Sequence, residues 1–95
     1  MFQHVVFLRL RDPIDVEEAA RRLRRLAEQV PSLRELQVGI DVIRSARSWD
    51  LVLQTTFDDQ QGMEAYQVHP AHVQVLIWLR EHVLESATVD YVVES

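Results

Sequence analysis

The chain has 95 residues, no cysteine and a formal net charge of −5 at pH 7. The length predicts one domain over residues 1–95. The missing cysteines exclude a disulfide framework, a thiolate nucleophile and a cysteine-ligated metal. The negative charge argues against nucleic-acid binding, which needs a cationic surface. Because no segment resembles a secretory signal or reaches the roughly 20 apolar residues of a membrane span, we expect a cytoplasmic protein without membrane contact.

The first third of the chain predicts a strand followed by a helix. Residues 2–10 are rich in valine, phenylalanine and leucine, which favours a strand, and Pro13 follows its end. Apolar residues then recur at helical spacing over residues 16–30, which predicts one amphipathic helix. Asp15 with Glu18 three residues later predicts a capping box at the start of this helix.

Two further strands are predicted in the middle of the chain. Residues 36–42 alternate between apolar and polar side chains, which is typical of a strand with one buried face. Gly39 interrupts this alternation and predicts a bulge or a close backbone approach. Residues 49–57 predict the next strand, and the two aspartates after it are cap candidates for a short helix that ends at Tyr66.

The segment from Tyr66 to His72 carries two of the four histidines. Pro70 predicts the first position of a helix, which places His69 at the N-cap and His72 in the first turn. The residues spaced to line one side of this helix are Val73, Leu76, Ile77, Arg80, Val83 and Leu84. The helix macrodipole disfavours an imidazolium there, so a neutral ring can accept a proton or bind a metal. The alternative is a purely structural role, which is the more frequent one for histidine at a helix start.

The predicted order is strand, helix, strand, strand, helix, strand, with residues 88–93 as the last strand. Right-handed crossovers turn this order into an α+β, ferredoxin-like βαββαβ fold with a four-stranded antiparallel sheet and both helices on one face. The other face would then carry exposed apolar side chains, which a second copy of the sheet would cover. We therefore expect a homodimer packed sheet on sheet. The apolar residues expected on this face include Val5, Phe7, Val89, Tyr91 and Val93.

The ordered set of segments resembles one known family. It comprises the first strand with His4, Gly39, Trp49-Asp50-Leu51-Val52-Leu53, Tyr66 with His69-Pro70-Ala71-His72, and Val89-Asp90-Tyr91. Together they resemble the stress-responsive dimeric A/B barrel (Dabb) family over essentially the whole chain. The resemblance implies a ferredoxin-like protomer and a dimeric α/β barrel.

The resemblance also implies candidate site residues, although many members have no known activity. One member, olivetolic acid cyclase, closes a linear polyketide by aldol condensation without a cofactor. By analogy, His72 would be the general base, Tyr66 would assist, Asp90 would orient the histidine and His4 would line the pocket. The loop from Asp41 to Ser48 and the helix after His72 differ from that enzyme, so the substrate does not carry over.

Two classes of function follow. The first is a domain that binds a small apolar or carbonyl, polyketide-like ligand, and acts as a cofactor-independent cyclase or lyase using His72, Tyr66 and Asp90. His4, His69 and Met63 would then bind the ligand. The alternative is a non-catalytic, stress-associated protein whose polar residues only form hydrogen bonds with one another.

Because a carboxylate in mid-strand needs a partner, Asp90 should contact His72 or His4. A metal on the histidines and Asp90 is a weaker alternative, and we expect neither metal nor cofactor.

Overall fold

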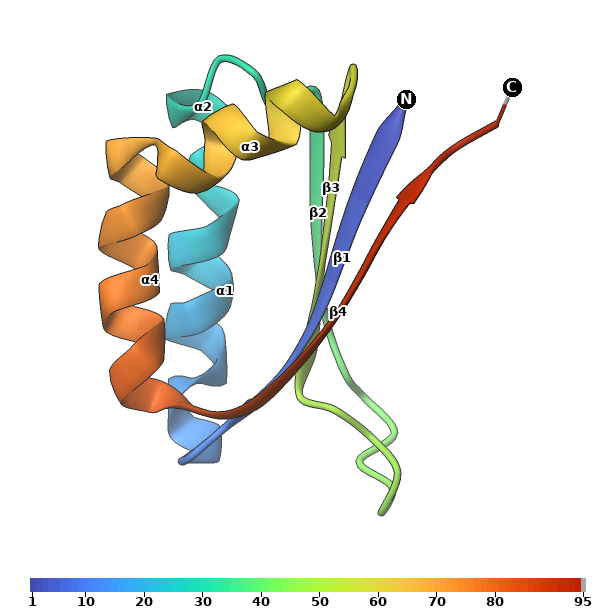
Figure 1. Ribbon diagram of the computed structural model, residues 1–95. Coiled ribbons are helices and arrows are strands. Elements are labelled where there is room, and N and C mark those ends of the chain that lie inside the picture. Colours follow the sequence, from blue (N-terminus) through green and yellow to red (C-terminus); the bar gives the residue numbers. More distant parts are fainter. Residues whose placement is uncertain (95) are drawn as a thin grey trace.

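A four-stranded antiparallel sheet carries the helices on one of its faces (Figure 1). This computed structural model describes residues 1–94. The sheet has the strand order β2-β3-β1-β4, which is the predicted ferredoxin-like fold. The elements in chain order are β1 (Phe2–Leu10), a 3₁₀ turn (Pro13–Asp15), α1 (Val16–Arg24), α2 (Leu26–Gln29), β2 (Glu35–Ile40), β3 (Leu51–Phe57), α3 (Gln60–Val68), α4 (Pro70–His82) and β4 (Val83–Val92).

The first helical region begins earlier than predicted and is divided in two. The backbone N–H of Ile14 donates to the side chain of Asp12 at 3.1 Å, so Asp12 caps a 3₁₀ turn. Asp15 already has helical backbone angles and makes no capping hydrogen bond. The predicted Asp15–Glu18 capping box is therefore wrong, because the proline after Asp12 starts the helical conformation three residues sooner. The predicted helix over residues 16–30 is instead α1 followed by α2, joined by Arg25, which keeps helical angles.

The last strand is longer than the predicted range of residues 88–93. β4 begins at Val83, directly after α4, and pairs with β1 along almost the whole length of both strands. The sequence pattern assigned Val83 and Leu84 to the preceding helix because their spacing also fits a helical face. The pairing with β1 overrides that local pattern, and the backbone N–H of Arg11 donates to the carbonyl of His82 at the junction.

The prediction of a bulge or a close backbone approach at Gly39 is wrong. The pairing of β2 with β3 continues without a shift through this position, and φ of Gly39 is not positive. A Cβ atom at Gly39 would instead meet Cγ1 of Val52 at 3.2 Å. The close neighbour is therefore a side chain across the strand pair, and the backbone makes no special demand.

The core lies between the helices and the inner face of β1, β2 and β3. Its most deeply buried large side chains come from α1, α2, α3 and β3. The N-caps that shape α3 and α4 are as predicted, since Asp59 accepts from the N–H of Gly62 and His69 accepts from the N–H of Ala71. No helix in the part of the chain that the structure describes is long and apolar enough to cross a membrane.

The other face of the sheet carries no helix (Figure 1). The pairing of β1 with β4 places Val5 opposite Val89 and Phe7 opposite Ala87 on this face. Val89 is 57% exposed and Tyr91 is 47% exposed. These apolar side chains therefore form the uncovered surface that the alternation of the strands predicted.

Candidate active site

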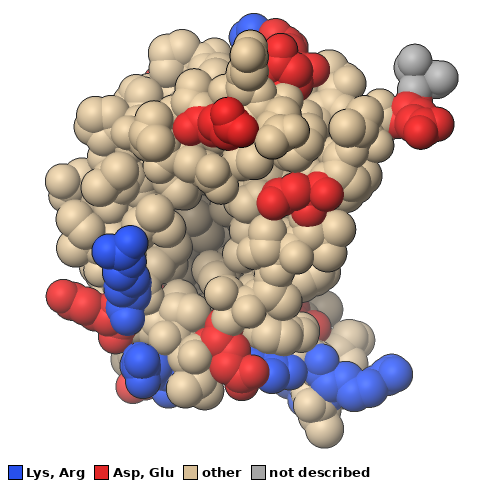
Figure 2. Space-filling model, viewed as in Figure 1, with Lys and Arg blue, Asp and Glu red and all other residues tan. Residues whose placement is uncertain are grey.

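A cavity of about 400 Å³ lies between α4 and the half of the sheet formed by β1 and β4. Figure 2 shows a hollow between the helical layer and the sheet. A volume of this order is typical of pockets for small organic molecules. The walls are mostly apolar with a few polar groups, and comprise His4, Val6, Leu8, Leu23, Leu53, Gln67, His72, Leu76, Leu79, Arg80, Val83, Ser86 and Thr88.

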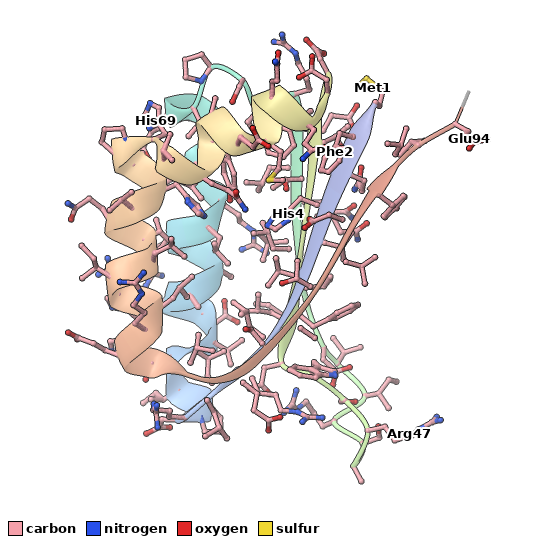
Figure 3. All side chains as sticks on the ribbon, in the orientation of Figure 1. Met1, Phe2, His4, Arg47, His69 and Glu94 are labelled. Carbon is pink, nitrogen blue, oxygen red and sulfur yellow. The ribbon has the colours of Figure 1, made fainter. Side chains whose placement is uncertain are left out.

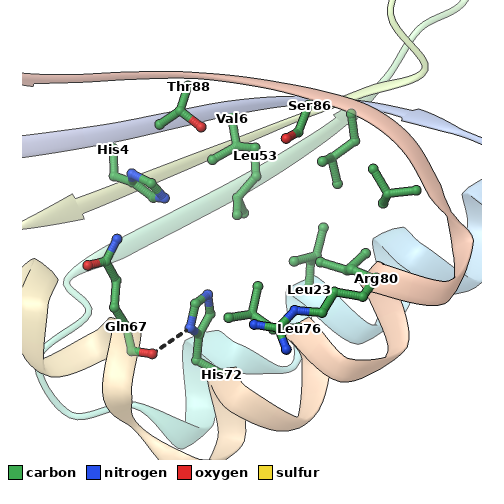
Figure 4. A pocket seen from close by; sticks show the side chains of 13 residues that line it. His4, Val6, Leu23, Leu53, Gln67, His72, Leu76, Arg80, Ser86 and Thr88 are labelled. Atoms are coloured by element: carbon green, nitrogen blue, oxygen red, sulfur yellow. Dashed lines mark hydrogen bonds between the residues drawn. The ribbon is translucent and has the colours of Figure 1, made fainter.

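His72 enters the cavity from the first turn of α4. Its Nδ1 donates to the backbone carbonyl of Gln67 at 3.0 Å, since a carbonyl can only accept. This bond fixes the tautomer and leaves Nε2 with a free lone pair. Figure 4 shows this second ring nitrogen pointing across the cavity toward His4. Burial and, to a lesser extent, the nearby His4 lower the pKa of His72, although the Gln67 carbonyl opposes this shift.

His4 faces the same end of the cavity from β1. It lies directly opposite Asp90 in the pairing of β1 with β4, and its Nδ1 hydrogen-bonds to Oδ1 of Asp90. Of the two partners expected for Asp90, the structure therefore selects His4. The pair of Asp90 with His72 that the family resemblance implied is not formed, because His72 uses its own Nδ1 on the Gln67 carbonyl. Asp90 orients the second histidine of the cavity instead.

Tyr66 lies behind both histidines. Its ring centroid is 4.3 Å from that of His72 and 6.3 Å from that of His4, in tilted and edge-on arrangements. The phenol is fully buried and does not line the cavity. Burial raises the pKa of Tyr66, and its hydroxyl has no hydrogen-bond partner among residues 1–94. The ring therefore supports the two imidazoles, while the hydroxyl remains unpaired.

The two other expected ligand-binding residues do not line the cavity. Met63 belongs to the hydrophobic core, because it lies on the face of α3 that packs on the sheet. Nδ1 of His69 accepts the N–H of Ala71 at 3.0 Å. Figure 3 places His69 at the corner between α3 and α4, away from His4. Within residues 1–94, no three side chains of histidine, aspartate or glutamate are grouped as metal ligands.

Sequence reasoning missed several polar residues of the cavity. Arg80 follows His72 by eight residues, so the helical repeat places both on one face of α4 with Leu76 between them. That spacing could have indicated that Arg80 belongs to the same site as His72. Ser86 and Thr88 share a face with Asp90 by strand alternation. The signal for Ser86 was hidden because the predicted strand began only at residue 88. Gln67 offered no signal before the fold was known.

Fold and cavity together define a ferredoxin-like α+β protein with a ligand-sized cavity between its last helix and its sheet. The chain belongs to the stress responsive A/B barrel domain family, whose model matches residues 2–93. This match confirms the resemblance found in the sequence. A comparison with curated proteins gives no match.

Solved structures support the same fold. A dimeric protein of unknown function from Bacteroides fragilis is 26% identical, with a TM-score of 0.83 over 95% of this chain and 93% of that one. A dimeric ferredoxin-like protein of unknown function from Thermobifida fusca is 25% identical, with a TM-score of 0.85 over 97% and 90%. A hydroxynitrile lyase from Passiflora edulis is 14% identical, with a TM-score of 0.84 over 98% and 93%, and shows the fold alone.

Proposed function

We propose that this protein binds a small, largely apolar carbonyl compound in the cavity and acts on it as a cofactor-independent lyase or cyclase. The observation that carries the proposal is the free Nε2 of His72 on the wall of a cavity of about 400 Å³. A helix–sheet interface packed solid around His72 would have favoured a non-catalytic protein. The open cavity instead supports the binding of a small molecule next to His72.

In the proposed reaction, Nε2 of His72 takes a proton from the carbon next to a carbonyl group. The resulting enolate attacks a second carbonyl carbon of the same molecule, which forms a carbon–carbon bond and leaves an alkoxide. The imidazolium of His72 then returns the proton to this alkoxide, so no cofactor is consumed. The lowered pKa of His72 keeps its ring neutral near pH 7, as a general base requires.

The neighbouring residues have positioning roles in this proposal. Asp90 holds the ring of His4, which faces the polar end of the ligand from β1. The ring of Tyr66 packs against both imidazoles and limits their rotation. His72 is thereby the one group to which the proposal assigns the proton transfer.

The protein is further proposed to be a homodimer, packed through the uncovered face of the sheet. The two relatives from Bacteroides fragilis and Thermobifida fusca are described as dimeric. Val89 and Tyr91 would be removed from water in such a dimer. Burial of apolar surface contributes roughly 25 cal/mol per Å², so covering this face favours the dimer. The cytoplasmic location and the single-domain organisation expected from the sequence stay predictions.

Hydrogen–deuterium exchange next to a ketone tests the proton transfer directly. The probe is 2-octanone in D₂O, and loss of its proton signals beside the carbonyl is followed by NMR with the wild-type protein. Replacement of His72 by glutamine retains a donor for the Gln67 carbonyl but removes the base, and should slow the catalysed exchange by about 10²–10⁴-fold. His82→Ala is the matched control, because His82 stacks on Trp78 outside the cavity.

The outcomes separate the two classes of function. Exchange that is lost in His72→Gln and retained in His82→Ala supports the assignment of His72 as the general base. Exchange that survives both changes means that another group is the base. If the wild-type protein accelerates exchange of neither 2-octanone nor a panel of other carbonyl compounds, the non-catalytic alternative is the better description, with the His4–Asp90 pair as a purely structural feature.

A further inference from the structure

Along α4, the cavity wall has two polar residues with an apolar residue between them. His72, Leu76 and Arg80 line it at a spacing of four residues, so they follow one face of the helix. At a rise of 1.5 Å per residue, the backbone positions of His72 and Arg80 are about 12 Å apart. Figure 4 shows the histidines at one end of the cavity, and the Arg80 side chain starting toward the other end and extending back along α4 to the side of Leu76.

Arg80 is the only formally charged side chain among the residues that line the cavity when the histidines are neutral. No carboxylate belongs to these walls, although the whole chain carries a net charge of −5. Among residues 1–94, Arg80 makes neither an ion pair nor a side-chain hydrogen bond. Glu85 on the nearby strand pairs with Arg9 instead. The guanidinium is therefore available to an external anion.

Ser86 extends this end of the cavity from the opposite wall. It lies in β4, four residues after the end of α4, so the α4–β4 junction brings it to the same end as Arg80. A hydroxyl facing a guanidinium across a small cavity supplies a further donor for one anionic group. The guanidinium itself matches the two oxygens of a carboxylate.

We infer that the ligand is an elongated oxo acid, with a carboxylate bound at Arg80 and Ser86, an alkyl segment beside Leu76, and its two reacting carbonyl groups near His72 and His4. This inference rests on the proposed function and narrows its substrate class from carbonyl compounds to those that carry a carboxylate. Arg80 is then a specificity-determining residue. It binds the end of the substrate remote from the proton transfer.

The alternative is that the Arg80 guanidinium stays in water at the mouth of the cavity and binds no ligand. Arg80 is exposed, and exposed arginines commonly cover apolar surface with the stem and keep the charge in water. Such a residue would not distinguish an acid from its ester. The discrimination between these two ligands is therefore the decisive measurement.

The experiment compares 7-oxooctanoate with its methyl ester by isothermal titration calorimetry on the full chain. At low ionic strength, the wild-type protein should bind the acid about tenfold more tightly than the ester, because a charge-assisted pair contributes only to the acid. Added salt should reduce this ratio. Arg80→Gln should bring the ratio close to one. Arg47→Gln should retain it, because Arg47 lies on the loop between β2 and β3, away from the cavity (Figure 3).

Equal affinity of the wild-type protein for acid and ester overturns the inference, and so does a ratio that survives Arg80→Gln. Binding of neither probe also overturns it. Deuterium exchange beside the ketone reports separately on the proposed function. Tight, Arg80-dependent binding without exchange retains the anion site and removes the catalytic step. Exchange of 2-octanone without preference for the acid retains the catalytic step and removes the anion site.

Discussion

The two halves of the sheet are covered differently by the helices. Beneath α1 and α3, the inner side chains of β3 are almost fully buried, with Leu51 at 2% and Phe57 at 0% exposure. On the other side of β1, the inner residues Ser86 and Thr88 of β4 remain exposed and border the cavity. The closed half supplies the packing that stabilises the fold, and the open half leaves room for a ligand. Tight packing and open space are thereby separated between the two halves of the sheet.

The largest expected effect concerns the outer face of the open half. Val89→Glu places a carboxylate in the proposed dimer interface, and should weaken dimerisation by about 100-fold or more because burial of an unpaired charge is costly. Light scattering after gel filtration should show twice the chain mass of 11.1 kDa for the wild-type protein and a lighter species for the variant.

Ile77→Glu is the control for this measurement. Ile77 is 49% exposed on α4, so the same change in chemistry occurs on the opposite layer of the molecule. The control should remain a dimer. A wild-type protein that is monomeric at micromolar concentration would contradict the proposed interface.

The next effect compares one leucine from each half. Leu26 is 0% exposed in the closed half, and Leu26→Ala should lower the free energy of unfolding by about 3 kcal/mol. Leu76 borders the cavity and is half-buried, so Leu76→Ala should cost only about 1 kcal/mol. Urea unfolding of the two variants measures the difference. Equal losses would show that the open half is packed as tightly as the closed one.

A smaller effect concerns pH and the buried histidine of the open half. Burial lowers the pKa of His72 below its ordinary value of 6.5, so the unfolded chain takes up the proton first as the pH falls. The contribution of His72 to stability is therefore fully present above about pH 6.5 and is lost as the pH falls toward the lower pKa of the folded protein.

Urea midpoints measured from about pH 7.5 to about pH 5 should decline in the wild-type protein. His72→Gln should make this decline shallower. Asp90→Asn should leave the pKa of His72 little changed in an NMR titration, because Asp90 hydrogen-bonds to His4. A strong response of His72 to the loss of Asp90 would mean that the two residues meet in solution.

The smallest expected effect concerns the Tyr66 hydroxyl, which lies where the two halves meet. A buried hydroxyl without a partner gives up its hydrogen bonds to water on folding. Tyr66→Phe should therefore change the free energy of unfolding by less than about 1 kcal/mol, with a gain as the expected sign. Turnover should slow by less than about tenfold, since the supporting ring is retained while a lost general base costs more. A loss as large as that of His72→Gln would assign the hydroxyl a direct catalytic role.

Much of the fold was predictable because its signals are local. Alternation over a few residues predicted the inner and outer faces of the strands, and Pro70 predicted the start of α4 with His69 as its N-cap. The boundaries were less predictable. Val83 and Leu84 fit a helical face as well as a strand, and only pairing with β1 decides between them. Asp15 fits a capping box, but Asp12 competes for the same helix start.

The sequence by itself determined the class of fold, the apolar outer face of the sheet and the presence of two histidines near the start of α4, because each depends on neighbours within a few positions. Only the tertiary structure decided that Asp90 meets His4 and not His72. That contact joins residues 86 positions apart and depends on the register of β1 with β4. The cavity and the place of Arg80 in it likewise exist only where α4 and β4 lie against the same strands. No local pattern encodes such a space, because its walls come from six separate elements of the chain.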